Sequence, residues 1–313
     1  MQSVPLPRYH PLDVFEFARA RQARAEALVL IFIEAFKGAS LRPVGTPMAV
    51  CANGDYAGYV SNGCVDADIA AQALEALKDT QMRRVSYGPD SPYLDIRLPC
   101  GGSVSLVVYP NPDPAVITAL CDEMRARRSI GLDFSETLSI GGVNERETAA
   151  LYQPPIRVVA AGRGEPLLMF ARAAYGLGID CLSLTPDAGA AAAISAQGSA
   201  AKTLEFGQPL DDVLGAAGQL PLDRYTAVVT LFHDHDYEMA VLIPALRSEA
   251  FYVGAMGSRQ THAARRETLK PQLSADQLAA LRGPIGLVPS QRDAGRLAIS
   301  VLAEIISVDP SPF

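Results

Sequence analysis

Residues 157–167 read Arg-Val-Val-Ala-Ala-Gly-Arg-Gly-Glu-Pro-Leu, an apolar run that leads into a turn with two glycines. The run, at 157–161, is short enough for a buried strand, and residues 165–175 are predicted to form a helix. A strand followed directly by a helix is the first half of a βαβ unit. We therefore expect a parallel sheet covered by helices in this part of the chain.

The same alternation continues through the second half of the chain. Further strands are predicted at 180–184, 227–232 and 251–253, and a further helix at 237–246. Residues 188–201, rich in Ala, Gly and Ser, could form either a helix or a mobile linker. Alternation of this kind predicts a Rossmann-like domain, in which ligands bind at the carboxyl ends of the strands.

The first half of the chain has a different pattern, in which strands occur in pairs between helices. Predicted helices lie at 11–25, 65–78 and 114–127, and predicted strands at 27–33, 48–52, 56–60, 94–98 and 103–109. Asn53-Gly54 is a hairpin signal between two of these strands. The pattern indicates an α+β arrangement.

Two consecutive prolines in the segment 152–155 mark the expected joint between the halves, because proline continues neither a helix nor a ladder. A chain of 313 residues also exceeds the usual size of one domain. We predict an α/β protein with an N-terminal α+β domain at residues 1–150 and a Rossmann-like domain with a parallel sheet at 151–313.

The composition limits the classes of function. Hydrophobic residues make up 49% of the chain, and the net charge of −7 leaves no excess of positive charge for coating a nucleic acid. The N-terminus lacks the features of a secretory signal, and the apolar run 27–33 is too short to span a bilayer. Five cysteines without a CxxC pair signal neither a zinc site nor a disulfide framework. We expect a cytoplasmic protein whose partners include neither nucleic acid nor membrane.

Two cysteines lie in glycine turns and are candidate thiol ligands. Cys64 ends the run Ser61-Asn62-Gly63-Cys64 just before a predicted helix, whose dipole favours the thiolate. Cys100 precedes Gly101-Gly102, where a ligand can approach the backbone. Thiolates attack electrophiles and bind soft metals. The alternative is that both cysteines are small buried hydrophobic residues.

The turn after the first Rossmann strand keeps only part of a dinucleotide fingerprint. It has Gly162 and Gly164 but Leu167 in place of a third glycine. The next strand ends at Thr185, without the acid that holds an adenosine ribose, and Glu165 places negative charge where a pyrophosphate would lie. NAD binding is therefore not expected. An equally good interpretation is that the two glycines only permit a tight turn.

The run His233-Asp234-His235-Asp236 follows the third Rossmann strand and resembles a metal site. Side chains at positions i and i+2 converge on one metal only in extended geometry, and His262 is the only other histidine near in sequence. A cofactor-lining role for His233 and Asp234, and an ordinary polar strand end, both remain open.

Residues 252–261 read Tyr-Val-Gly-Ala-Met-Gly-Ser-Arg-Gln-Thr and follow the next strand. Gly257 and Ser258 can cap a helix whose free N–H groups face the ligand edge of the sheet. Arg259 adds a fork of hydrogen-bond donors. We predict that an anionic group binds there.

Together with Leu-Arg-Gly-Pro-Ile-Gly-Leu at 281–287, this stretch resembles the XdhC/CoxI family, the maturation factors of molybdenum hydroxylases such as xanthine dehydrogenase. The resemblance covers nearly the whole chain. In the first half, 61–64 stand for the family's Ser-Gly-Gly-Cys motif and 100–102 for its Cys-Gly-Gly motif. Departures lie in the second half, at Glu165, Thr185 and Phe232.

The resemblance implies a chaperone rather than a catalyst. Such a protein binds the molybdenum cofactor, protects it, supports its sulfuration and delivers it to an apo molybdenum hydroxylase of the xanthine dehydrogenase or aldehyde oxidase type. The cofactor would be molybdopterin or its cytosine dinucleotide form. The implied partners are the apo-hydroxylase, a cysteine desulfurase and a cofactor nucleotidyltransferase, and a homodimer is expected because twofold dimers are the commonest oligomers.

Cofactor-binding residues are expected in both domains, with Cys64 and Cys100 as candidate molybdenum ligands. They are Ser61, Gly63, Cys64, Cys100, Gly101, Gly162, Gly164, His233, Asp234, Gly254, Gly257, Ser258 and Arg259. Two other classes stay open: an NAD(P)-dependent oxidoreductase that uses the second sheet, and a thiol redox or sulfur-transfer enzyme that uses Cys64 alone.

Overall fold

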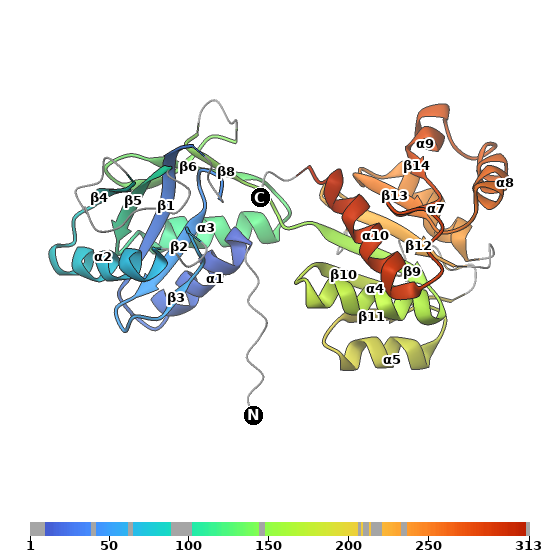
Figure 1. Ribbon diagram of the computed structural model, residues 1–313, viewed down its shortest axis with the longest axis horizontal. Coiled ribbons are helices and arrows are strands. Elements are labelled where there is room, and N and C mark those ends of the chain that lie inside the picture. Colours follow the sequence, from blue (N-terminus) through green and yellow to red (C-terminus); the bar gives the residue numbers. More distant parts are fainter. Residues whose placement is uncertain are drawn as a thin grey trace. The chain divides into compact units, whose positions relative to one another are not determined.

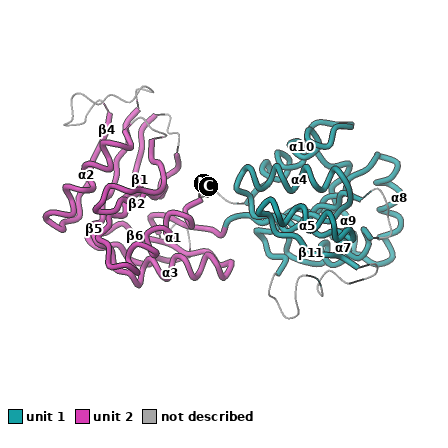
Figure 2. Tube along the Cα trace, turned by 90° about the horizontal axis from the view of Figure 1, so that it is seen from below, with its two compact units in different colours: residues 1–6, 155–311 teal, residues 7–154, 312–313 magenta. Residues whose placement is uncertain are grey.

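The computed structural model describes residues 10–38, 42–61, 65–88, 102–143, 148–205, 208, 213, 221–232 and 237–310. Its contacts divide these residues into two compact units. Unit 2 runs from Pro7 to Pro154 and unit 1 from Pro155 to Ser311 (Figure 2). In the described ranges, no helix has both the length and the apolar character needed to cross a bilayer.

Unit 2 is built on a five-stranded antiparallel sheet with the strand order β3-β2-β1-β5-β4 (Figure 1). Its strands are β1 (Leu28–Lys37), β2 (Pro47–Cys51), β3 (Tyr56–Ala57), β4 (Arg83–Tyr87) and β5 (Ser103–Pro110). The predicted hairpin at Asn53-Gly54 is confirmed, because β2 and β3 pair across it. The strand predicted at 94–98 lies outside the described residues.

The central strand β1 is buried on both faces, and alternate side chains enter two different cores. Val29, Ile31 and Ile33 face helix α2 (Asp66–Asp79). Residues 28, 30 and 32 pack instead with helices α1 (Pro11–Gln22) and α3 (Pro114–Arg125). Helices on both faces give the α+β layers that the sequence predicts.

A second, three-stranded sheet completes unit 2 and was not predicted from the sequence. Its order is β7-β6-β8, with β6 (Ile130–Phe134), β7 (Leu138–Gly141) and β8 (Ala150–Tyr152).

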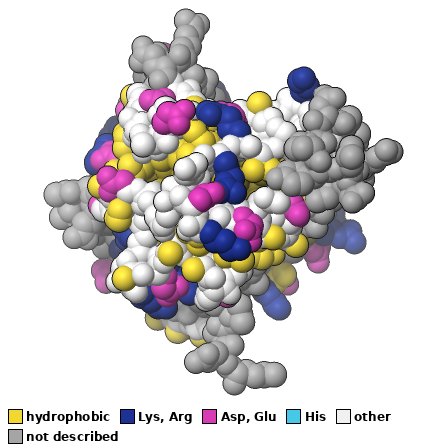
Figure 3. Space-filling model, turned by 90° about the vertical axis from the view of Figure 1, so that its left-hand side faces the viewer, with side chains coloured by type: hydrophobic (Ala, Val, Ile, Leu, Met, Phe, Trp, Pro, Cys, Tyr) yellow, Lys and Arg dark blue, Asp and Glu magenta, His cyan; other side chains and the backbone are white. Residues whose placement is uncertain are grey.

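Basic and acidic side chains are interspersed on the molecular face in Figure 3. Ion pairs in this unit include Arg84 with Glu34, whose Nε and Oε1 lie 2.9 Å apart.

Unit 1 contains a six-stranded parallel sheet with the order β11-β10-β9-β12-β13-β14 (Figure 1). This is the doubly wound order of a Rossmann fold, and the predicted fold class is confirmed. Its strands are β9 (Arg157–Gly162), β10 (Asp180–Thr185), β11 (Ala200–Thr203), β12 (Thr226–Leu231), β13 (Tyr252–Ala255) and β14 (Leu281–Arg282).

Helices cover both faces of this sheet. On one face α4 (Gly164–Gly176), α5 (Ala188–Ala196) and α10 (Ala294–Ser307) pack against side chains such as Val158 and Val229. On the other, α7 (Glu238–Arg247), α8 (Arg259–Leu269) and α9 (Ala275–Ala280) pack against Val159 and Val228. The segment 188–201, for which helix and linker were both open, forms α5 and the start of β11.

Candidate functional site

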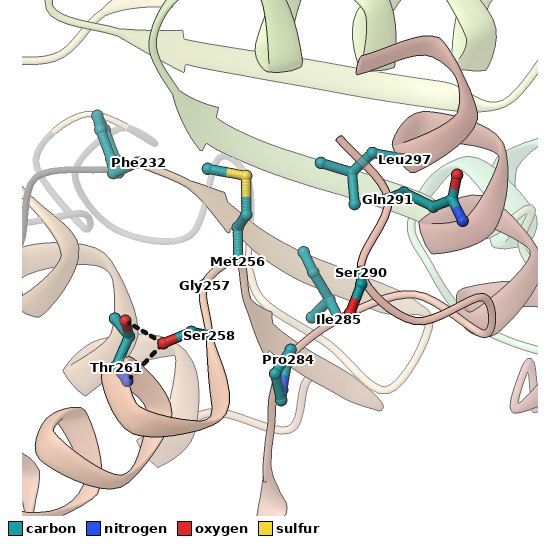
Figure 4. Close-up of a pocket in the computed structure, with 10 residues that line it drawn as sticks. All are labelled: Phe232, Met256, Gly257, Ser258, Thr261, Pro284, Ile285, Ser290, Gln291 and Leu297. Atoms are coloured by element: carbon teal, nitrogen blue, oxygen red, sulfur yellow. Dashed lines mark hydrogen bonds between the residues drawn. The ribbon is translucent and has the colours of Figure 1, made fainter. Parts of the chain in front are cut away.

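A pocket of about 310 Å³ lies at the carboxyl ends of β12 and β13 in unit 1 (Figure 4). Phe232 follows β12, and residues 256–258 connect β13 to α8. The loop 284–291 and Leu297 on α10 close the other side. Open parallel sheets bind ligands at this edge, so the pocket is the candidate site.

The start of α8 forms one wall of the pocket and has the capped geometry that the sequence predicts. The Ser258 hydroxyl accepts a hydrogen bond from the Thr261 N–H at 3.0 Å and shares another with the Thr261 hydroxyl at 2.8 Å. Gly257 has a φ of +147°, and a Cβ there would lie 3.1 Å from the Thr261 methyl carbon. A side chain at position 257 would therefore disturb the cap.

Among the described residues, no side chain caps the other backbone donors at this helix start. The first N–H groups of any helix have no acceptor within the helix, and the Ser258 side chain uses only that of Thr261. Arg259 is the first helical residue, and its exposed guanidinium has no partner among the described residues. These donors can receive an anionic group, and its binding stays a prediction.

The rest of the pocket is neutral. Phe232, Met256 and Ile285 are buried side chains that form its apolar walls. Ser290 and Gln291 add a hydroxyl and an amide at the rim (Figure 4). None of the ten described lining residues carries a charge. The lining therefore suits an uncharged group that has both apolar faces and hydrogen-bonding edges.

The loop 284–291 is fixed to helix α10. The Ser300 hydroxyl accepts a hydrogen bond from the Val288 N–H at 2.7 Å, and the Glu304 carboxylate accepts one from the Gly286 N–H. Both acceptors lie on the same helix, four residues apart. This wall of the pocket is therefore formed before any ligand binds.

A buried ion pair lies behind the turn between β13 and α8. Arg265 and Glu238 are 2% and 0% exposed, and two nitrogen–oxygen contacts of 3.0 and 2.9 Å join them. Arg265 also donates to the carbonyl of Met256 at 2.7 Å, and Thr230 donates to Glu238 at 3.2 Å. The pair thus holds the backbone of a pocket residue in place. The pair could not be recognised from the sequence, because position 265 lies in a helix with many charged residues.

His262 lies on the same helix, beside the pocket. A Cβ at Gly283 would lie 2.3 Å from its Nδ1, which shows how closely the ring packs on the Gly-Pro-Ile-Gly-Leu loop. Burial, followed by the charges of Arg265 and Arg266, lowers the pKa of His262. The histidine is therefore held in its neutral form beside the pocket.

Side chains of the protein pack against Gly162 and Arg163 in the turn after β9. A Cβ at Gly162 would lie 2.8 Å from the Leu231 Cβ, so this glycine permits close packing with β12. Arg163 lies over the ring of Tyr237, 4.6 Å from its centroid, and Phe232 stacks on the same ring at 5.6 Å. The side chains that follow β9 and β12 thus stack where the strand order reverses.

Gly164 and Gly254 are both predicted cofactor-binding residues, and they occupy different surroundings. Gly164 has a φ of +63°, as a tight turn into α4 requires, and no atom lies within 4 Å of a Cβ added there. A Cβ at Gly254 would lie 2.6 Å from the Ile285 side chain, so this glycine lets the pocket loop pack on β13. Cofactor contact by either residue remains a prediction.

At the end of β10, the Asp187 carboxylate is engaged in a helix cap. Thr185 is 0% exposed, and its hydroxyl accepts a hydrogen bond from the Asp187 N–H at 3.3 Å. The Asp187 carboxylate caps α5 and accepts from the N–H groups of Gly189 and Ala190 at 2.8 and 3.1 Å. The acid nearest to the ribose position is therefore used within the fold.

In unit 2, Ser61 lies in a buried hydrogen-bond network just before the Cys64 position. The Asp66 carboxylate accepts hydrogen bonds from the N–H groups of Val60 and Ser61 and from the Ser61 hydroxyl, at 2.8, 3.0 and 2.8 Å. The Ser61 hydroxyl in turn accepts from the Val65 N–H at 2.8 Å. This network was missed from the sequence and fixes the backbone on both sides of residues 62–64.

Several predicted site residues lie outside the described residues. They are Gly63, Cys64, Cys100, Gly101, His233 and Asp234. The described cysteines are Cys51, Cys121 and Cys181, all buried. Burial raises the pKa of the Cys121 thiol to about 11 and that of Cys181 to about 12, so both are protonated at neutral pH. Among the described residues, no three His, Cys, Asp or Glu side chains gather into a metal site.

Two family models match this chain. The XdhC Rossmann domain matches residues 158–305, and the XdhC and CoxI family matches residues 21–88. The chain belongs to the XdhC/CoxI family. The candidate pocket lies entirely within the matched Rossmann domain of this XdhC/CoxI protein.

Comparison with individual proteins extends the match over nearly the full chain. The molybdenum cofactor insertion chaperone PaoD of Escherichia coli (strain K12) is 30% identical over 305 residues, which cover 94% of this XdhC/CoxI chain and 87% of PaoD. A solved structure from Bacillus halodurans, described as a xanthine dehydrogenase, matches with a TM-score of 0.74 at 18% identity. That match covers 97% of this chain and 98% of the other, and shows a shared fold.

Proposed function

We propose that this protein is a chaperone that binds the molybdenum cofactor, protects it and delivers it to an apo molybdenum hydroxylase of the xanthine dehydrogenase or aldehyde oxidase type. The observation that carries the proposal is the similarity to the cofactor insertion chaperone PaoD along 94% of the chain. The pocket at the strand ends of unit 1 supports it, because it gives a binding protein a preformed site. No catalytic step by this chain is required.

The described residues suit the organic part of the cofactor. A phosphate needs hydrogen-bond donors, and the N–H groups at the start of α8 together with Arg259 supply them. A neutral ring system needs apolar walls with hydrogen-bonding edges, as residues 256, 285 and 291 provide. When bound, the cofactor supplies a molybdenum centre held by a dithiolene, which is soft enough to accept thiolate ligands.

Cys64 and Cys100 are the proposed molybdenum ligands. The support for Cys64 is its sequence position two residues before the start of α2, where a helix dipole favours a thiolate, and the buried network of Ser61 and Asp66 that holds the flanking backbone. Cys100 rests on the Cys-Gly-Gly motif alone. These thiols would hold the metal and shield it from water.

The wider role follows from the chemistry of the cargo. The protein would keep the cofactor bound while a cysteine desulfurase installs the sulfido ligand, and it would receive the cofactor as molybdopterin or, after a nucleotidyltransferase, as the cytosine dinucleotide form. We propose a cytoplasmic homodimer. The oxidoreductase alternative loses support because Thr185 is buried and the Asp187 carboxylate caps a helix.

Binding and transfer of isolated cofactor test the proposal. Titration should saturate at about one cofactor per subunit, and the loaded protein should restore activity to a purified apo-hydroxylase. Cys64→Ser and Cys100→Ser should keep the fold but lose retained molybdenum, since serine conserves size without the soft ligand. Cofactor binding no tighter than to an unrelated α/β protein would exclude the chaperone function, and unchanged molybdenum in the double variant would exclude the thiol ligands.

A further inference from the structure

The size of the unit 1 pocket limits what it can hold. Its volume of about 310 Å³ is at the lower end of the roughly 300–1,000 Å³ of small-molecule sites. A single ring system with a sugar matches that volume, whereas a whole dinucleotide exceeds it. The pocket can therefore receive one part of a larger cofactor.

The lining selects an uncharged ring. Met256, Ile285 and Leu297 point toward the same space and offer apolar contact to flat faces (Figure 4). A charged group placed there would meet no opposite charge among the described lining residues, and burying an unpaired charge is unfavourable. A heterocycle with apolar faces and polar edges avoids that cost.

Polar groups around the pocket remain available for such edges. The Gln291 amide nitrogen has only a long contact of 3.5 Å, to the Pro289 carbonyl, and its oxygen has no partner in the described ranges. The Ser290 hydroxyl likewise makes no hydrogen bond with a described residue. An amide and a hydroxyl can together donate to and accept from a base edge or ribose hydroxyls.

The start of α8 forms another wall of the pocket and indicates where an attached phosphate would lie. Ser258 and Thr261 line the pocket, and the free N–H groups and Arg259 lie at the same helix start. Toward β9, the side chains of Arg163, Tyr237 and Phe232 form a stack beside the point where the strand order reverses. A ligand in the pocket therefore does not continue toward β9 and β10 as a dinucleotide in a Rossmann fold does.

We propose that the pocket binds one mononucleotide unit, with the base and ribose between Met256, Ile285 and Leu297 and the 5′-phosphate at the start of α8. The inference rests on the proposed function in one respect: the nucleotide would belong to the dinucleotide form of the cofactor. Pocket occupancy by a free mononucleotide is independent of molybdenum.

Calorimetric titration of the purified full chain tests this inference. The probes are 5′-CMP, 5′-GMP and 5′-AMP, the corresponding nucleosides, and inorganic phosphate. At least one mononucleotide should bind at about one per subunit and at least tenfold tighter than inorganic phosphate. If no mononucleotide exceeds phosphate, or if neopterin monophosphate binds and none of the nucleotides does, the inference is wrong.

Variants test separately the contacts with the base and ribose and the contact with the phosphate. Leu297→Phe should weaken mononucleotide and nucleoside alike by at least tenfold, because the larger side chain fills the pocket. Arg259→Gln should weaken the mononucleotide about tenfold, as expected for one lost charge-assisted hydrogen bond, and leave the nucleoside unchanged. Arg172→Gln, an exposed position on α4 with no described partner, is the charge-matched control and should change neither. Equal affinities in all three variants would overturn the site.

Two further measurements keep this inference separate from the chaperone function. Gln291→Ala removes an amide at the rim without enlarging a core residue, so it tests the pocket even if Leu297→Phe fails to fold. Nucleotide binding without cofactor binding would exclude the chaperone function and keep the pocket assignment. Cofactor binding that saturating mononucleotide does not displace would keep the function and overturn the assignment.

Discussion

The two halves of the Rossmann sheet follow the same strand–helix alternation, yet their carboxyl edges differ. At the β9–β10 half, Thr185 is buried, the Asp187 carboxylate caps α5, and Arg163 stacks on Tyr237. At the β12–β13 half, Ser258 caps a helix whose remaining donors are free, and a pocket opens beside it. The first half bonds these groups within the fold, and in the second half several groups have no partner among the described residues.

The fold determines where a ligand could bind, but it does not determine whether binding groups are available there. Parallel strands bring several loops to one edge, and the residues after each strand then decide whether donors and acceptors are satisfied internally. A group that already caps a helix cannot bind a ribose without leaving that helix end unpaired. Ligand capacity therefore has to be assessed separately for each half of the sheet.

The largest expected effect comes from breaking the buried ion pair Arg265–Glu238, which supports the β12–β13 half of the sheet. Arg265→Met should lower the free energy of unfolding by about 3–5 kcal/mol, because it removes the cationic partner of the buried Glu238 carboxylate. Denaturant titration followed by circular dichroism measures this loss. Arg172→Met is the exposed control and should change stability by less than about 0.5 kcal/mol. A loss below about 1 kcal/mol in Arg265→Met would show that the pair does not hold this half.

A second prediction concerns the anion contact. Arg259→Ala should weaken cofactor binding by about 1–3 kcal/mol if the guanidinium pairs with a phosphate. The melting temperature should hardly move, because the side chain is exposed and has no described partner. Cofactor titration and thermal unfolding on the same samples measure the two effects. A large fall in melting temperature with unaltered binding would make Arg259 a structural residue.

A third prediction compares one glycine from each half. Gly257→Ala should destabilise the protein by about 1–3 kcal/mol, because residue 257 has a φ of +147° and its new methyl group would crowd Thr261. Gly176→Ala, in α4 with no atom within 4 Å of the added Cβ, should be neutral or stabilising by up to about 1 kcal/mol. Equal stability of the two variants would contradict the strained geometry of the α8 turn.

The smallest expected effect is the binding of dinucleotides at the β9–β10 half of the sheet. NAD and NADP should give no calorimetric binding at micromolar concentration, because the Asp187 carboxylate caps α5, Thr185 is buried at the end of β10 and Glu165 repels a pyrophosphate. A mononucleotide that occupies the other half serves as the positive control. Micromolar affinity for either dinucleotide would remove the contrast between the halves and restore the oxidoreductase alternative.

Much of the fold could be predicted from the sequence, because its main strands are short apolar runs between turn residues. β9, β10, β12 and β13 are of this kind. The sheet β6–β8 and the strands β4, β11 and β14 were missed, since they have two to five residues and only partly buried patterns. Strands this short are recognised by their hydrogen-bonded neighbours, which the sequence does not show.

The candidate site was predictable only where it is local in sequence. The cap at Gly257-Ser258 could be found because a helix start depends on adjacent residues. The pocket could not, because Phe232, Ile285 and Leu297 come from separate segments that meet only in the folded unit. Arg265 and its neighbour Arg266 are alike in sequence, and only the packing of α8 shows which one is buried.

The attachment of the pocket loop to α10 has a consequence for protein synthesis. Residues 284–291 are held by Ser300 and Glu304, which the ribosome adds later than every other part of the pocket. A nascent chain can complete β9 to β13 and still lack this wall. The pocket wall therefore gains this support only once α10 has docked, and a translation product that ends before Ser300 lacks it.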